Sequence, residues 1–202
     1  MMKTTNSKRW KITATPALLT AAFFLISFIV PKGWQKSGPA ENKYEIGLWK
    51  VGGNNDSKMC GVIRSGDKNY YPDDYGSMMQ KVSSQQYLGK RVRLTGFMKS
   101  RAVTAWAGFY LRADNEDSKE PLTFDNMHDR PITGNTVWKE YKIELDVPYN
   151  ASKIAFGALL HGEGQIWFDD LKLEIVGEST IKADYVKCDT TLKRVPENLD
   201  FE

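Results

Sequence analysis

The stretch GQIWFDDLKLEI at residues 164–175 decides the fold class. Trp167, Leu171 and Leu173 share one phase of a two-residue repeat, as side chains on one face of a β-strand do. A helix would repeat near 3.6 residues instead. Because Phe168 lies in the other phase, the first half of the stretch is apolar on both faces. The stretch predicts a strand that is buried at its start.

Short runs of the same kind recur between residues 44 and 176, and turn residues such as Gly, Asn, Asp and Pro separate them. Eight or nine strands without intervening helices require two packed sheets. The sequence therefore predicts an all-β fold, a two-sheet antiparallel jelly-roll sandwich. The candidate strands are 44–50, 58–63, 76–82, 91–99, 106–113, 122–124, 137–147, 153–160 and 165–176.

An uncharged apolar run at residues 12–31 precedes this region, and four basic residues precede the run: Lys3, Lys8, Arg9 and Lys11. Its twenty residues, at about 1.5 Å each in a helix, match a hydrocarbon core of about 30 Å. We therefore expect an N-terminal hydrophobic helix in 1–31 that serves as a signal-anchor or a signal peptide. The basic flank predicts a cytoplasmic N-terminus and an extracytoplasmic body, membrane-anchored or secreted.

The remaining chain is expected to comprise a tether at 32–42, the sandwich at 43–176 and a polar tail or linker at 177–202. Cys60 and Cys188 are the two cysteines, and the sequence leaves open whether they pair.

Charge argues against a nucleic-acid partner. The formal net charge is +3, but without the four basic residues before the apolar run the body has 24 basic and 25 acidic residues, or −1. The basic footprint of a nucleic-acid binder is missing.

Catalysis is poorly supported by the sequence. Only His128 and His161 are available as neutral-pH bases, and no Gly-x-Ser-x-Gly, His-Glu-x-x-His, Cys-x-x-Cys or P-loop pattern occurs. Adjacent carboxylates on a strand point to opposite faces and make a poor acid/base pair for glycoside hydrolysis. We therefore expect a non-catalytic protein without a cofactor, except for a structural calcium ion discussed next.

Asp169 and Asp170 follow the buried half of the last predicted strand. A buried carboxylate must be hydrogen-bonded, paired or metal-bound. The favoured interpretation is that one of them caps loop amides at a sandwich edge. The alternative is a structural Ca²⁺ site, which needs more oxygens than these two residues supply.

A ligand surface is expected where aromatic and planar polar side chains meet. Trp106, Tyr110 and Arg112 alternate on one strand and should share a face. The loop 125–130 adds hydrogen-bonding groups from Asp125, Asn126, His128 and Arg130. Two alternatives stay open: Trp106, Trp138 and Trp167 are core residues, and Arg130 braces its loop by pairing with Asp125 or Asp129.

Several motifs in this order resemble a known bacterial module. They are GKRVRLTGF (89–97), WAG (106–108), FDNMHDRPITG (124–134), WKEY (138–141), LDVP (145–148) and GEGQIWFDD (162–170). Together they resemble the galactose-binding-like, carbohydrate-binding-module-like β-sandwich found beside bacterial erythromycin-esterase-like and C-terminal-processing-peptidase-like domains. The resemblance covers roughly 57–176 and implies a jelly roll that is accessory to an enzyme. In such proteins a motif like NLDFE, here at 198–202, opens the next segment.

These observations lead to one hypothesis and one alternative. The hypothesis is an exported, membrane-tethered, non-catalytic module that binds carbohydrate or another cell-surface polymer and meets the membrane through residues 12–31. The alternative is a structural or protein-interaction domain that scaffolds an envelope partner.

Overall fold

The computed structural model describes residues 28–66, 69–71, 73–116, 118–181 and 191–202. These residues form nine strands and one short 3-10 helix, which confirms the all-β prediction. The elements are β1 (Trp34–Ser37), η1 (Glu41–Lys43), β2 (Tyr44–Trp49), β3 (Cys60–Ser65), β4 (Tyr75–Ser83), β5 (Lys90–Asp114), β6 (Thr123–Asp125), β7 (Ile132–Asp146), β8 (Lys153–His161) and β9 (Gln165–Glu178).

The expected N-terminal helix lies almost entirely outside the described residues. In the described part of the chain, no helix has the length and apolar character needed to cross a bilayer.

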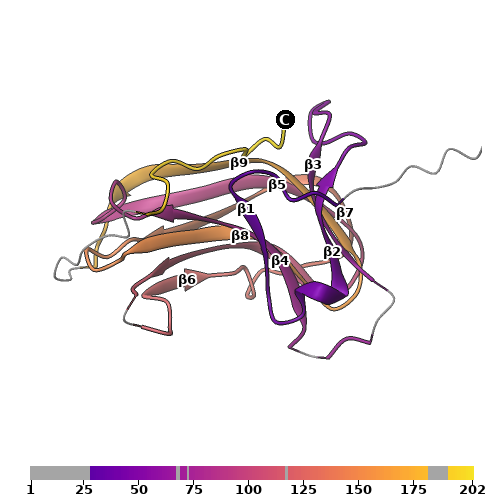
Figure 1. Ribbon diagram of the computed structural model, residues 1–202, viewed down its shortest axis with the longest axis horizontal. Coiled ribbons are helices and arrows are strands. Elements are labelled where there is room, and N and C mark those ends of the chain that lie inside the picture. The colour runs from indigo at the N-terminus through magenta and orange to yellow at the C-terminus, as the bar shows by residue number, and fades with distance from the viewer. Residues whose placement is uncertain (1–27, 67–68, 72, 117, 182–190) are drawn as a thin grey trace, which may run out of the picture.

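Strand β5 joins the two layers of the sandwich. The first part of β5 pairs with β7 and β9, and its last nine residues pair with β8. One layer therefore contains β1, β4, β8 and β6, and the other contains β2, β3, β9 and β7 (Figure 1). The two expected sheets are thus one nine-stranded, nearly barrel-shaped sheet. Seven strands follow the order β1-β4-β8-β5-β9-β3-β2, and β6 and β7 each pair with β5 outside this order.

Irregular pairing explains how one strand serves both layers. The register of β5 against β7 shifts three times between Met98 and Ala107, and Ala102 has a φ of 51°. Bulges of this kind bend a strand and increase its twist. The sequence therefore predicted two strands, 91–99 and 106–113, where the chain makes one bent strand.

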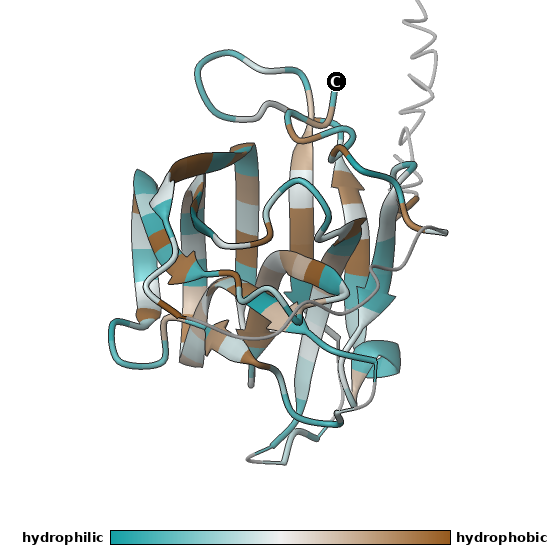
Figure 2. Ribbon diagram, turned by 90° about the vertical axis from the view of Figure 1, so that its left-hand side faces the viewer, coloured by the Kyte–Doolittle hydropathy of each residue, from teal (hydrophilic) through white to brown (hydrophobic). Residues whose placement is uncertain are grey.

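The core lies between the layers. The rings of Phe109 on β5 and Phe168 on β9 meet edge to face, with their centroids 6.3 Å apart. Trp34 on β1 contacts Phe156 on β8 in the same way, at 5.8 Å. Apolar and polar bands alternate along the strands, as the two-residue repeat requires (Figure 2).

The range 32–42 is not a tether. It contains β1, which pairs with β4, and it buries Trp34 in the core. Only four residues of β1 extend between Gly33 and Gly38, both with positive φ, so no alternation is visible in the sequence. Gly38 is required because an added Cβ would lie 2.4 Å from the carbonyl oxygen of Tyr75.

Residues 196–202, which we call the C-terminal strap, also pack on the sandwich instead of forming a free tail. Phe201 is 2% exposed and its ring lies 5.3 Å from Trp34 and 5.4 Å from Phe168. The carbonyl oxygen of Asn198 accepts a hydrogen bond from the indole of Trp34 at 3.0 Å. The strap therefore extends the core beyond the last strand.

Replacing Phe201 by Ala should lower the free energy of unfolding by about 3–5 kcal/mol, because it leaves a cavity beside Trp34 and Phe168. Urea unfolding measures the change. Val195→Ala is the matched control, since Val195 is 63% exposed and its truncation should cost less than about 0.5 kcal/mol. Equal stability of Phe201→Ala and Val195→Ala would show that the strap does not belong to the core.

Candidate functional site

Trp106, Tyr110 and Arg112 share the face of β5 that points away from the core, as their spacing predicts. Tyr110 clusters there with Met79 and Leu159, which come from β4 and β8. Trp106 packs against the edge of this cluster. The core interpretation of Trp106 is therefore wrong for the main core, although its ring is partly buried.

Four aromatic rings, which we call the ring row, cross this face. Trp106 stacks on His161 with a centroid distance of 4.7 Å and an interplanar angle of 15°. The ring centroid of His161 in turn lies 4.9 Å from that of Tyr75. His128 meets the Trp106 ring edge to face, with the centroids 5.3 Å apart. The row therefore joins β4, β8, β5 and the loop after β6.

Sequence reasoning missed Tyr75 and His161 as members of this site. His161 on β8 pairs with Tyr75 on β4 at one side and with Trp106 on β5 at the other, so the three side chains meet. Strand register between segments distant in sequence leaves no local signal. Local alternation shows only which residues of one strand share a face.

Tyr110 and Arg112 are less available than expected. Tyr110 is 6% exposed, and its hydroxyl accepts a hydrogen bond from Ser77 at 3.1 Å. Burial raises the pKa of Tyr110, so the hydroxyl stays neutral. The guanidinium of Arg112 donates to Asp114 at 2.7 Å. Both residues line a small pocket whose rim includes Phe124.

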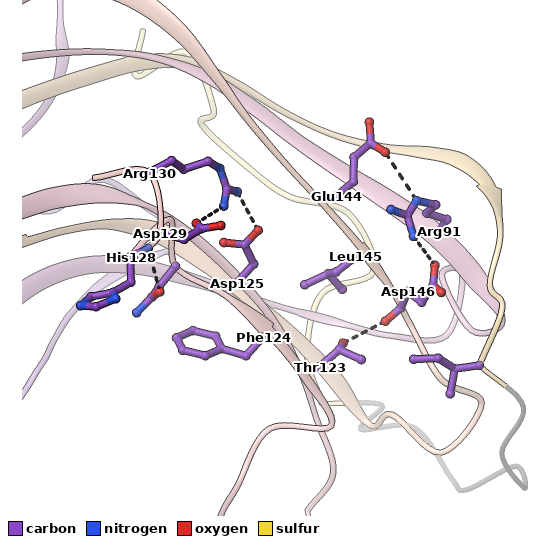
Figure 3. Close-up of a pocket in the computed structure, with 12 residues that line it drawn as sticks. Arg91, Thr123, Phe124, Asp125, His128, Asp129, Arg130, Glu144, Leu145 and Asp146 are labelled. Atoms are coloured by element: carbon purple, nitrogen blue, oxygen red, sulfur yellow. Dashed lines mark hydrogen bonds and ion pairs between the residues drawn. The ribbon is translucent and has the colours of Figure 1, made fainter. Parts of the chain in front are cut away.

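Phe124 is the accessible aromatic ring at this place. It is 50% exposed and lies directly across the strand pair from Arg112. It also lines a second, larger cavity, which we call the polar pocket (Figure 3). Phe124 therefore connects the outer face of the first layer to the polar pocket, and it was not among the predicted ligand residues.

Two ion-pair clusters form the walls of the polar pocket (Figure 3). Arg130 donates to Asp125 and to Asp129, each at 2.6 Å. At the other end, Arg91 contacts Glu144 at 3.4 Å and Asp146 at 3.0 Å. The bracing interpretation of Arg130 is therefore the one that the geometry supports.

The pairs fix the charges of the pocket. The hydrogen bonds that Arg130 donates to Asp125 and Asp129 raise the pKa of its guanidinium. A hydrogen bond from Arg93, with a further one from Arg91, lowers the pKa of Glu144. Glu144 is thus ionised at neutral pH and acts as a hydrogen-bond acceptor.

The loop 125–130 is held by its own side chains. Asp125 accepts a hydrogen bond from the amide of Met127 at 2.8 Å, and Asn126 accepts one from the amide of His128 at 3.1 Å. Met127 adopts a φ of 62° and is buried. The structure therefore brings all four predicted loop residues, Asp125 included, to the wall of the pocket.

Asp169 and Asp170 do not point to opposite faces. Asp169 accepts a hydrogen bond from the amide of Asn54 at 2.9 Å, and Asp170 accepts one from the side-chain amide of the same residue at 2.8 Å. The reason is a bulge: Asp170 has a φ of 51°, and the register of β9 against β5 shifts beside it. Asp169 caps loop amides, as the favoured interpretation stated.

The alternative, a calcium ion at Asp169 and Asp170, stays a prediction. Among the residues that the structure describes, no three or more His, Cys, Asp or Glu side chains gather as a metal site. Burial raises the pKa of Asp169 to about 6, and the amides of Asn54 and Asp170 offset part of that effect.

Cys60 is a buried free thiol on β3, and burial raises its pKa to about 12. Its expected candidate partner, Cys188, lies outside the described residues.

The fold defines a class, the jelly-roll β-sandwich. A solved structure of the CBM22-1 xylan-binding domain from Paenibacillus barcinonensis Xyn10C matches with a TM-score of 0.53 and 11% identity, over 74% of this chain and 90% of that one. The enzymatically active domain of bacteriophage CBA120 tailspike protein 4 matches with a TM-score of 0.52 and 12% identity, over 72% and 20%. At these identities the likeness shows the fold alone.

One curated protein is similar in sequence. It is the uncharacterized HTH-type transcriptional regulator YbfP of Bacillus subtilis (strain 168), 38% identical over 173 residues. The match covers 85% of this chain and 57% of that protein, so the chain spans little more than half of its relative. No family model matches the chain.

The buried carboxylate of Asp169 predicts a pH dependence of stability. Its pKa rises from 3.8 to about 6 on folding, so the folded state holds this proton more tightly than the unfolded chain. The contribution of Asp169 to stability is therefore fully present below about pH 4 and is lost as the pH rises through about 6. The free energy of unfolding of the native protein, measured relative to that of Asp169→Asn, should therefore fall by about 1–3 kcal/mol between about pH 4 and pH 6.

Urea unfolding of both proteins between pH 4 and 8 measures this difference. The matched control is Asp200→Asn, which removes an exposed carboxylate near the same loop. A difference that does not change with pH would contradict the prediction.

Proposed function

We propose that the chain is a non-catalytic binding module for carbohydrate or another cell-surface polymer, in an exported and membrane-tethered protein. The single observation that carries the proposal is the exposed ring of Phe124 between the ring row and the polar pocket. Sugars need a flat apolar surface for their C–H groups and planar polar groups for their hydroxyls. Both lie side by side here.

The proposed mechanism assigns one task to each part. Phe124 stacks against a sugar ring, and Trp106 with His128 supplies the aromatic wall beside it. The carboxylates of Asp125 and Asp129 accept hydrogen bonds from hydroxyls, and Arg130 donates. Because ion pairs already hold these groups, little side-chain entropy is lost on binding.

The structural relatives support this proposal through the chemistry in their names. The Paenibacillus domain is described as xylan-binding, and its fold covers 74% of this chain. A polysaccharide ligand is therefore the first to test.

The curated relative favours a second candidate, a ligand-sensing or interaction module of a regulator. Its name describes a transcriptional regulator of helix-turn-helix type. The described residues of this chain contain no α-helix, so the region shared with the relative would supply ligand or partner binding instead of DNA contacts. The scaffold alternative belongs to the same class, because it also needs a protein partner.

Replacing Phe124 by Ala should weaken polysaccharide binding by roughly tenfold, because one stacking contact of about 1 kcal/mol and its buried area are lost. Trp106→Ala should weaken it too, through loss of the ring that supports His128. The measurement is a glycan array followed by affinity electrophoresis of the full chain in xylan and galactan. Tyr149→Ala is the matched control, an exposed aromatic residue outside the site.

Binding that survives Phe124→Ala and Trp106→Ala would reject this face as the ligand surface. Failure of the array, together with capture of a defined protein partner that Phe124→Ala abolishes, would favour the second candidate.

A further inference from the structure

A second aromatic surface lies on the opposite layer, on the outer side of β2, β3, β9, β5 and β7. We call it the tryptophan face, and it consists of Trp49, Trp138, Trp167 and Lys99. The ammonium of Lys99 lies 4.8 Å from the ring centroids of both Trp138 and Trp167. Trp49 meets Trp167 edge to face at 6.0 Å. Trp167 is buried with Cys60 and Val62 in a second core cluster, which confirms the core interpretation for this residue. Trp49 and Trp138 pack against that cluster and are partly exposed, so the core interpretation of Trp138 is wrong.

The described chain begins on this face. Phe28 packs against the cluster around Trp167, and the guanidinium of Arg64 lies 5.3 Å from the Phe28 ring. The carbonyl oxygen of Ile29 accepts a hydrogen bond from the amide of Leu48 at 3.0 Å. Gly47 permits this approach, because an added Cβ would lie 2.5 Å from the Phe28 backbone. The last residues of the apolar run are therefore bound to the sandwich.

This attachment leaves no free linker between the apolar run and the sandwich. Sixteen uncharged residues, 12–27, precede Phe28, and at about 1.5 Å each in a helix they would extend over about 24 Å. A hydrocarbon core is about 30 Å thick. The range expected to be a tether contains β1 instead. If the apolar run anchors the chain, the sandwich must therefore lie against the bilayer, with the site where Phe28 packs on the sandwich nearest to the lipid.

We propose that the tryptophan face rests on the lipid surface of the membrane. The proposal depends on the proposed anchor and goes beyond the polymer-binding role. Tryptophan prefers the interface between hydrocarbon and water, where its ring is apolar and its N–H is polar. The ammonium of Lys99, beside the indoles, supplies a cation for anionic headgroups. Glu45 is neutralised by its ion pair with Arg64, and Asp169 is buried.

Two of the three tryptophans on this face reach solvent. Trp49 and Trp138 are partly exposed at the two sides of the face, on β2 and β7. Ile29, next to Phe28, is 55% exposed. Partly exposed indole rings, with the exposed Ile29 beside them, fit the interface of a bilayer.

The test uses the full chain in vesicles of phosphatidylcholine and phosphatidylglycerol that contain brominated acyl chains, which quench nearby tryptophan fluorescence. Trp138→Phe should lower the quenched fraction of the emission, because it removes an emitter at the lipid surface. Trp106→Phe is the matched control on the opposite layer. It should raise the quenched fraction, because it removes an emitter that the lipid does not reach. Trp49→Phe provides a second variant with the same expected sign as Trp138→Phe.

Vesicle flotation separates the two ways in which the test can fail. Protein that does not float with the vesicles overturns the anchor and this inference with it. Protein that floats, but in which Trp138→Phe and Trp49→Phe raise the quenched fraction as Trp106→Phe does, overturns the tryptophan face alone. If the protein sediments as a dimer and Trp138 is not quenched by the vesicles, the face binds a second copy of the chain. This outcome would likewise reject a lipid surface.

Discussion

The bend in β5 is the constraint on which the rest of the structure depends. This single strand of 25 residues contributes to both layers, and the register shifts between Met98 and Ala107 turn it from one to the other. Its phase in the second half sends Phe109 inward and Trp106 outward. Its phase in the first half sends Lys99 to the opposite outer face. Both candidate surfaces are therefore set by one strand and its bulges.

The strand alternation makes much of this architecture predictable from the sequence. All nine candidate strands coincide with observed ones, although two of them are parts of β5. The shared face of Trp106, Tyr110 and Arg112 followed from spacing alone. Four loop residues were also expected, and they do line the polar pocket. The two-residue repeat is enough to predict strand positions and shared faces, because it depends only on the order of residues along one strand.

What the sequence could not supply depends on contacts between distant segments. The pairing of Tyr75 with His161, and of His161 with Trp106, requires a register that no local pattern encodes. The burial of Phe201 beside Trp34 joins the two ends of the described chain, in two ranges whose composition is polar. Asp170 shows the third cause, since a bulge with positive φ reverses the side that alternation assigns.

The two outer faces of the sandwich are suited to different partners because their chemistry differs. The polar pocket holds carboxylates in ion pairs with Arg91 and Arg130, groups that suit hydrogen bonding to hydroxyls. The tryptophan face has a single ammonium between two indoles and a buried carboxylate behind it. The ring row and the tryptophan face belong to opposite layers, so a sandwich whose tryptophan face lies on lipid turns the ring row away from the bilayer. The polar pocket extends from the loop after β6 to Arg91 and Glu144 on β5 and β7. The two proposals then place a polymer and a membrane on opposite sides of one domain, which is the arrangement that a chain without a tether requires.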